Sequence, residues 1–332
     1  MTAEATSPQK TSPAWLQHLQ ALLRTQEAVL LLITVIAVLV LSTQTDKFLT
    51  VKNLLNQGRF MTETGLIALP MTFIIITGGI DLSVGSVAGL SAIMLGYGWK
   101  NWGLPLEGAI ALALAISTLA GFMNGLLIVL FRVPPLIMTL ATMAFYRGLA
   151  EGIARARSVT GYPAWFFELG QKETLGIPNQ LYLLVIAIII TAIVLSRTTF
   201  GRSLYAIGNN ELAARFSGIP VRRNKLLIYT FSGFMAGLAG YILVSRVSTT
   251  RSDMGGGWEM DAIAAVVVGG TSIAGGSGSI VGTTIGLVLI QLLRNGLALT
   301  GVTGDATIVV IGSVLILSTL ANLVIQRRVH GV

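Results

Sequence analysis

The stretch TFIIITGGIDLSVGSVAGL, from Thr72 to Leu90, sets an aspartate and two adjacent glycines between two apolar runs. Asp81 can accept hydrogen bonds from the backbone N–H groups of a following helix, and Ser83 is a second capping residue. Gly78 and Gly79 permit an irregular backbone at the same place. Either Asp81 caps the next helix, or a discontinuous membrane helix turns polar groups toward an aqueous pathway. The first interpretation, in which Asp81 has the structural role of a helix cap, is favoured.

The residue types present do not support catalysis. Asp81 has no base partner nearby, because the only histidines are His18 and His330 near the two ends. The chain has no cysteine, which excludes disulfides, thiolate metal sites and a cysteine nucleophile. It has no G-x-x-x-x-G-K-[ST] loop, although residues 275–279 are glycine-rich. We therefore expect no enzyme activity, no metal site and no cofactor or ATP bound by this chain.

A second informative stretch is the basic segment Ser196–Tyr229, which contains a short helix signal. Asn210 is a good N-cap, and Glu211 lies in the first turn, where its charge suits the helix dipole. Gly218 and Pro220 end the predicted helix, which runs from residue 211 to residue 217. Its small apolar surface would dock in a groove of a partner or lie on the membrane surface. On these residues alone the membrane surface is favoured.

The composition is that of a polytopic membrane protein. Of the 332 residues, 53% are hydrophobic and 11% are charged, against roughly 25% charged in soluble domains. So few charges could not cover the surface of a soluble protein of this size. The net charge of +8 falls in loops and at helix ends, as expected for loops that flank a membrane. Lipids are therefore the expected surroundings, and nucleic acid is not an expected partner.

Ten apolar runs meet or approach the ~20 residues that a helix needs to cross ~30 Å of hydrocarbon. We therefore predict an all-α polytopic membrane protein with about ten transmembrane helices. The predicted spans are Ala28–Ser42, Thr62–Thr77, Val84–Gly98, Gly108–Leu130, Pro134–Ala150, Leu181–Ser196, Leu226–Ser245, Asp261–Ala274, Ser279–Ala298 and Ala306–Ile325.

Ten spans put both ends of the chain on one side of the membrane. The loop Arg197–Lys225 carries six basic residues and one acid, whereas Glu151–Gln180 carries three of each. The positive-inside rule therefore places the first loop and both termini in the cytoplasm. It also places Asp81 on or near the cytoplasmic side, between the second and third spans.

The predicted organisation is a cytoplasmic tail over residues 1–27, a membrane domain over residues 28–326 and a cytoplasmic tail over residues 327–332. The first tail contains a short amphipathic stretch, Trp15–Leu23, suited to the membrane surface. No short apolar core in this tail precedes a small-residue cleavage site, so no cleaved signal peptide is expected.

The opening stretch has a weak echo in the second half of the chain. Ile76–Gly89 and Val267–Gly282 both run from apolar residues through Gly-Gly and Gly-Ser to a later glycine. Repeated halves with broken helices are common in transporters, but glycine-rich segments also look alike by composition, and both explanations remain open. The candidate pathway residues are Gly78, Gly79, Asp81, Ser83, Asn124, Gly269, Gly270 and Asn295, because polar and broken positions in membrane spans are functional candidates.

A third region, Arg251–Ile263, is predicted to be an external loop. It contains the triple glycine 255–257 next to Trp258. Such a flexible element could gate a pore or contact a delivering protein, and Asp253 and Trp258 are the candidate residues. Aromatic residues are also ordinary at membrane interfaces.

Four stretches together resemble the membrane permease subunits of bacterial ABC sugar importers of the ribose, xylose, rhamnose and autoinducer-2 type. They are GGIDLSVGS (Gly78–Ser86), RVPPLIMTLATM (Arg132–Met143), GRSLYAIGNNELAARFSGI (Gly201–Ile219) and VVGGTSIAGGSGSIVGT (Val267–Thr283). The resemblance covers about Leu54 to Ile325, and the order and spacing of the four stretches fit as well.

This resemblance implies an inner-membrane permease with a vitamin-B12-importer-like architecture. It implies a separate ATPase subunit that hydrolyses ATP, a periplasmic or lipoprotein sugar-binding protein, and a second permease copy or a paralogue. It also implies that the cytoplasmic loop carries a coupling helix that docks on the ATPase, with the positions Asn210, Glu211, Ala214, Gly218 and Ile219.

Two other classes of protein compete with the importer. An ion-coupled secondary transporter could use Asp81 and other acids as relays, and it would be a complete machine in one polypeptide. An intramembrane enzyme would need a nucleophile and a base, which the chain does not offer. The sequence does not distinguish ribose, rhamnose and autoinducer-2 as the monosaccharide-like cargo.

Overall fold

The computed structural model describes residues 26–302 and residues 304, 306, 307, 309, 310, 312, 313 and 316. The predicted C-terminal tail over residues 327–332, the stretch Trp15–Leu23 and nearly all of the predicted first tail lie outside the described residues. Most of the predicted span Ala306–Ile325 also lies outside them.

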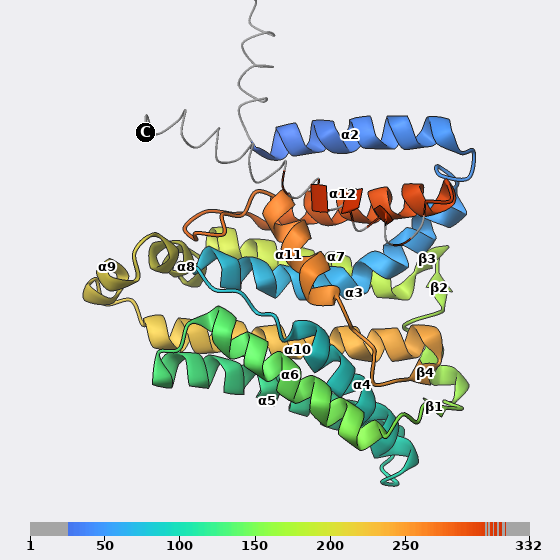
Figure 1. Ribbon diagram of the computed structural model, residues 1–332, viewed down its shortest axis with the longest axis horizontal. Coiled ribbons are helices and arrows are strands. Elements are labelled where there is room, and N and C mark those ends of the chain that lie inside the picture. Colours follow the sequence, from blue (N-terminus) through green and yellow to red (C-terminus); the bar gives the residue numbers. More distant parts are fainter. Residues whose placement is uncertain are drawn as a thin grey trace, which may run out of the picture.

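The described chain is a bundle of helices with a few two-residue strands (Figure 1). The helices are α2 (Gln26–Gln44), α3 (Val51–Ile76), α4 (Val84–Lys100), α5 (Leu106–Phe131), α6 (Pro135–Ala154), α7 (Asn179–Arg197), α8 (Thr199–Asn209), α9 (Glu211–Phe216), α10 (Val221–Val247), α11 (Trp258–Val268) and α12 (Ile280–Leu299). A 3₁₀ turn covers Ala164–Phe167. Strand β1 (Val159–Thr160) pairs antiparallel with β4 (Thr249–Thr250), and β2 (Glu173–Thr174) pairs with β3 (Ile177–Pro178).

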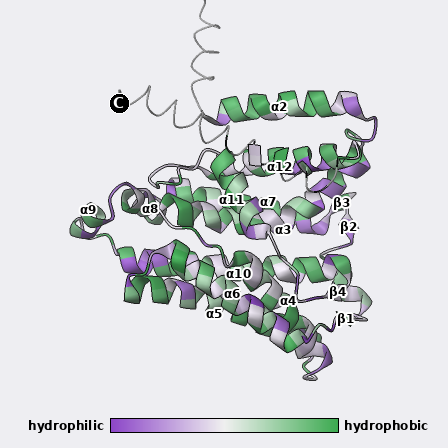
Figure 2. Ribbon diagram, in the orientation of Figure 1, coloured by the Kyte–Doolittle hydropathy of each residue, from purple (hydrophilic) through white to green (hydrophobic). Residues whose placement is uncertain are grey.

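The bundle has two distinct ends. In Figure 1, α8 and α9 project at the left and the four strands gather at the right, and we call these the α9 end and the strand end. Six of the described helices, α2, α3, α5, α7, α10 and α12, are long and apolar enough to cross a membrane. Figure 2 shows hydrophobic colour along helices such as α2 and α5 and hydrophilic colour gathered in the loops at both ends. These features agree with a multi-pass membrane protein.

Three predicted spans form helices that are not among these six. Val84–Gly98 becomes the 17-residue helix α4, and Pro134–Ala150 becomes α6, which carries Arg147 and Glu151. The largest difference concerns Asp261–Ala274, where α11 has only 11 residues. Such a helix rises about 16 Å, roughly half of a ~30 Å hydrocarbon core. The helix ends at Val268, six residues before the predicted end at Ala274.

The chain before α11 is also different from the external loop that the sequence predicts. Gly255 is buried against α4, and its carbonyl oxygen would lie 2.3 Å from a β-carbon placed on Gly85. Arg147 holds the same segment, because its Nη1 donates to the carbonyl oxygens of Ser252 at 2.6 Å and Met254 at 2.9 Å. The segment therefore runs into the bundle as irregular backbone, which membrane proteins tolerate where protein covers it.

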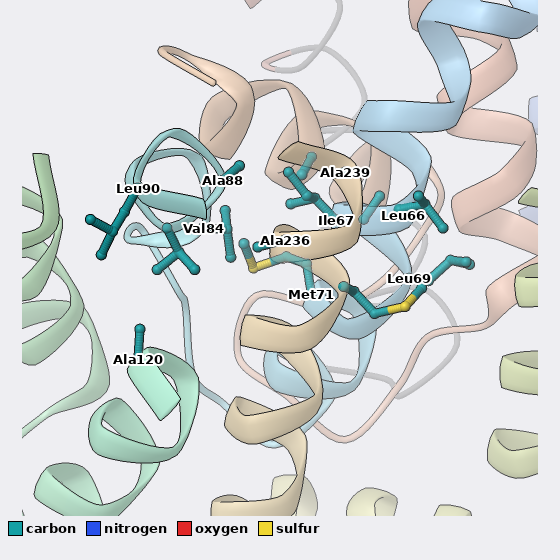
Figure 3. Close-up of a cluster of buried hydrophobic side chains, with 14 of the residues drawn as sticks. Leu66, Ile67, Leu69, Met71, Val84, Ala88, Leu90, Ala120, Ala236 and Ala239 are labelled. Carbon is teal, nitrogen blue, oxygen red and sulfur yellow. The ribbon is translucent and has the colours of Figure 1, made fainter. Parts of the chain in front are cut away.

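Helix α10 forms the centre of the buried core, between α3 and α4 (Figure 3). Ala236 and Ala239 on α10 face Ala88 of α4 and the larger side chains of α3 in that view. Its contact with α5 is closer still, because a β-carbon on Gly121 would lie 2.2 Å from the carbonyl oxygen of Tyr229. Small residues allow this close backbone approach, which drives helix association in lipid through van der Waals contact.

Candidate translocation and coupling sites

The loop between α3 and α4 holds Asp81 in a buried network of polar side chains. Oδ1 of Asp81 accepts hydrogen bonds from the N–H of Ser83 at 3.0 Å and from its hydroxyl at 2.6 Å. Oδ2 accepts from the hydroxyl of Ser232 at 3.0 Å. Asn124 donates to Oγ of Ser83 at 2.7 Å, and the Tyr146 hydroxyl lies 3.2 Å from Oδ1 of Asn124. The network therefore joins this loop to α5, α6 and α10.

The structure brings together three of the predicted pathway residues, Asp81, Ser83 and Asn124. Asp81 does bond to the backbone just before the next helix, although α4 begins at Val84 and Ser83 makes no side-chain cap bond. Asp81 lies deeper than expected, since it is 1% exposed and bonds to the twelfth residue of the 27-residue helix α10. In this conformation the network is a packed polar core.

Asp81→Asn is expected to preserve the fold, whereas Asp81→Ala is expected to destabilise it. The asparagine oxygen can still accept from Ser83, and its amide can donate to Ser232. The alanine leaves buried donors unpaired, which costs about 1–3 kcal/mol. Thermal unfolding of both variants in detergent measures the difference. Normal folding of Asp81→Asn with loss of transport would contradict a purely structural role and assign Asp81 to the pathway.

The two glycine-rich breaks end their helices with the same backbone motif. At the end of α3, Gly78 N–H bonds to the carbonyl three residues back at 2.9 Å, and Gly79 N–H bonds five residues back at 3.0 Å. At the end of α11, Gly270 and Thr271 do the same at 2.9 and 3.2 Å. Gly78 and Gly270 have φ of 75° and 93°, as in a Schellman helix end. This helix end is common in proteins, and Gly78 is the first glycine of its pair whereas Gly270 is the second, so the shared motif does not by itself establish a structural correspondence.

Both breaks meet α8 at the α9 end of the bundle. The N–H of Gly276 donates to the carbonyl oxygen of Ile76 at 2.9 Å, which ties the loop after α11 to the end of α3. Gly208 of α8 lies against this bond, because a β-carbon there would be 1.8 Å from the Ile76 oxygen and 2.4 Å from the Gly276 nitrogen. The Tyr205 hydroxyl donates to the carbonyl oxygen of Gly278 at 2.7 Å. We call these five residues the α8 junction.

Helix α8 is not predicted in the sequence analysis, and the α8 junction is therefore not predicted either. The signal was present but short: Thr198 caps the helix by accepting from Gly201 N–H at 3.1 Å, and Gly201, Leu204 and Ile207 are its buried positions. A spacing of three residues is helical. The importance of Gly208 comes from residues far away in the chain, so no local pattern could have predicted it.

The predicted short helix of the basic loop is present as α9. Asn210 caps it by accepting from the N–H of Ala213 at 2.9 Å, and Gly218, with φ of 80°, follows its end. Glu211 forms ion pairs with Arg215 at 3.0 Å and with Lys225 of α10 at 2.6 Å. Partial burial raises the pKa of Glu211, but these two cations lower it by more, so the pKa lies below its ordinary value.

Helix α9 has one buried face and one exposed apolar face. Ala214 is buried in a small cluster with Ile207 and Val221, and Ile219 packs against that cluster. Leu212 and Phe216 point away from it and are 65% and 86% exposed. The anchored helix therefore presents two large apolar side chains at the tip of the bundle.

The remaining predicted residues lie in other places. Asn295 exchanges amide hydrogen bonds with Asn53 at 2.7 and 3.1 Å, between α12 and α3. Gly269 packs so tightly that a β-carbon would lie 2.5 Å from the carbonyl oxygen of Gly282. Asp253 is exposed and paired with Arg251, whereas Trp258 is half-buried at the start of α11. Among the described residues, no group of three or more His, Cys, Asp or Glu side chains is placed to hold a metal ion.

These features describe a multi-pass helical membrane protein with broken helices and an exposed helix at one end. Its similarity to a known protein family defines its class. Residues 53–319 match the family model described as "Branched-chain amino acid transport system / permease component". The chain therefore belongs to this family of permease components.

Two kinds of relative are similar over most of the chain. The ribose import permease protein RbsC of Bacillus subtilis is 44% identical over 289 residues, which cover 86% of this chain and 89% of that protein. The autoinducer 2 import system permease protein LsrD of Photorhabdus luminescens is 34% identical over 302 residues, 89% of this chain and 90% of that protein. LsrD of Yersinia enterocolitica is 37% identical over 270 residues, 80% of this chain and 81% of that protein.

Proposed function

We propose that this permease is the membrane subunit of an ATP-binding-cassette importer that carries a small sugar or sugar-like solute across the inner membrane. The observation that carries the proposal is the anchored helix α9 with its exposed Leu212 and Phe216, in a chain similar to two import permeases. A partner ATPase hydrolyses the ATP, and a periplasmic or lipoprotein sugar-binding protein delivers the cargo. A second permease copy or a paralogue completes the pore.

A neutral cargo rich in hydroxyl groups fits the polar residues near the breaks. The charges of Glu63 and Asp261 are neutralised within the chain by ion pairs with Arg246 and Arg294. The buried hydroxyls of Tyr229 and Thr271 have no hydrogen-bond partner among the described residues, and Thr271 lies in the break after α11. Hydroxyls of this kind would gain partners from a sugar or water when the breaks separate. The named relatives favour ribose or the autoinducer-2 furanose, and rhamnose remains a further candidate.

The proposed membrane architecture has ten crossings in a vitamin-B12-importer-like arrangement. Nine of them are α2 to α7, α10, the segment that ends in the half-helix α11, and α12, and the tenth is the predicted span Ala306–Ile325. The α9 end faces the cytoplasm, because its loop Arg197–Lys225 carries six basic residues and one acid. Both termini then lie in the cytoplasm.

Coupling would pass from α9 through α8 to the helix breaks. A single residue, Asn210, separates α9 from α8. A movement of α9 would therefore move α8 as well. The α8 junction then connects that movement to the end of α3 and to the loop after α11 at the same time. This arrangement supports an importer driven by a docked ATPase more than an ion-coupled carrier, which needs no exposed docking helix.

Leu212→Asp combined with Phe216→Asp is expected to prevent association with the ATPase. Two carboxylates in the docking face would be desolvated without partners, which opposes binding strongly. The two side chains are exposed, so the permease itself should keep its stability. Co-purification with the ATPase subunit of the same importer measures the effect, with an expected loss of at least tenfold in bound ATPase.

The matched control is Leu175→Asp, because Leu175 is 93% exposed but lies in the β2–β3 turn at the strand end. This variant should retain the ATPase in full. Equal ATPase recovery from the double variant and the control would remove α9 as the docking element.

A further inference from the structure

A cavity of about 260 Å³ lies at the α9 end, separate from the polar network and the α8 junction. The end of α5, the turn into α6, helix α9 and the start of α10 enclose it. Its polar wall consists of Arg132, Arg215, Arg222, Lys225 and Glu211. Four cations and one carboxylate give this small space a strongly positive potential.

Two of these cations have no internal counter-charge. Glu211 is already paired with Arg215 and Lys225. Within the part of the chain that the structure describes, Arg132 and Arg222 have no ion pair. Two guanidinium groups that share a concave site and have free donors suit an oxyanion, because each fork can bind phosphate oxygens in pairs.

The fold holds Arg132 at this place. Arg132 is the residue that ends α5, and its φ of 55° is a left-handed conformation uncommon for a residue with a side chain. Only Val133 separates Arg132 from the Pro134–Pro135 pair, and Pro135 begins α6, so the turn is short and stiff. The arginine is therefore fixed where a membrane-crossing helix ends.

The remaining wall of the cavity is apolar, and exposed apolar side chains flank it in the chain. Ile128 and Val129 of α5 line the cavity. Leu130, Phe131 and Ile137, which flank it in the chain, are exposed large hydrophobic residues. Because α5 is one of the helices long and apolar enough to cross a membrane, its end lies at the level of the lipid head groups. A basic pocket next to exposed apolar side chains matches the two parts of a phospholipid.

We propose that this cavity binds the phosphodiester head group of an anionic phospholipid, with the acyl chains lying against the exposed apolar side chains of α5 and α6. The bound head group bridges the α5–α6 turn to α10, beside the Glu211 ion pairs that anchor α9. Basic pockets between membrane helices bind head groups of this kind. The proposal requires only that these helices cross a membrane, so it stands independently of the importer function.

The test is native mass spectrometry of the purified permease titrated with phosphatidylglycerol, with phosphatidylcholine as the neutral reference lipid. The wild type is expected to retain phosphatidylglycerol at least tenfold more strongly than phosphatidylcholine. Arg132→Gln combined with Arg222→Gln should remove this preference, and Arg132→Lys combined with Arg222→Lys should keep part of it. Thermal unfolding without added lipid confirms that each variant is folded.

The matched control is Arg155→Gln combined with Arg157→Gln. These arginines are also exposed, and Arg155 ends α6 with φ of 47°, but they lie toward the strand end. The control should keep the wild-type lipid preference. Equal loss in both double variants would overturn the site, as would retention in Arg132→Gln/Arg222→Gln. Displacement of the lipid by millimolar inorganic phosphate would show an anion site without lipid specificity and would overturn the lipid assignment.

Discussion

Gly208→Ala is expected to reduce sugar uptake more than tenfold while the permease still binds its ATPase. The added β-carbon would lie 1.8 Å from the Ile76 oxygen and 2.4 Å from the Gly276 nitrogen. Both atoms belong to backbone and to one hydrogen bond, so the substitution must push α8 away or break that bond. The substitution leaves Leu212 and Phe216, the proposed docking face of α9, unchanged. The measurement is uptake in proteoliposomes, with ATPase activity and ATPase binding recorded on the same samples.

Gly152→Ala is the matched control for this prediction. Gly152 lies in helix α6, and a β-carbon there would meet no atom within 4 Å. Alanine in an open helical position stabilises by up to about 1 kcal/mol relative to glycine, so this variant should transport normally. Wild-type uptake by Gly208→Ala would contradict the role of the α8 junction. Loss of both uptake and ATPase binding would indicate a folding defect, and Tyr205→Phe, which removes only the bond to Gly278, then provides the milder test.

Arg246→Met is expected to destabilise the permease by about 3–5 kcal/mol, because it leaves a buried carboxylate without its partner. Glu63 of α3 is 4% exposed and accepts two hydrogen bonds from Arg246 of α10, at 2.7 and 3.0 Å. The centre of the Phe60 ring lies 4.6 Å from Cζ of the same guanidinium. The measurement is thermal unfolding in detergent together with the yield of monodisperse protein.

The double variant Glu63→Met/Arg246→Met is expected to recover most of the lost stability. Replacing a buried ion pair with apolar side chains of similar volume is often neutral or stabilising. The comparison between the single and double variants isolates the unpaired charge from the loss of packing. An unfolding temperature of Arg246→Met equal to that of the wild type would contradict the buried pair.

The sequence predicted the features that depend on residues close together in the chain. The bounds of α9 follow from Asn210 and Gly218, and both residues cap or end the helix as expected. The half-helix α11 was missed because the apolar run continues through Val267 and Val268 into the glycine pair. Hydropathy counts such residues as membrane-compatible, whereas the backbone turns out of the helix at Gly270.

Contacts between distant segments could not be predicted from one sequence. The partner of Asp81 on α10 is Ser232, which is 151 residues away, and an ordinary serine gives no signal of that contact. Gly208 is one of 38 glycines, and only the approach of Ile76 and Gly276 distinguishes it. Composition and the four recognisable stretches were enough for the class of protein, while the geometry of the sites required the structure.

The most direct test of the importer proposal is sugar uptake by the chain in liposomes, with and without its ATPase and binding-protein subunits. We expect no uptake by this chain alone, and uptake by the complete assembly only when ATP is present on the ATPase side. Ribose and the autoinducer-2 furanose are the first cargoes to measure. Uptake by this chain alone, driven by an ion gradient, would rule out the importer and indicate an ion-coupled secondary transporter.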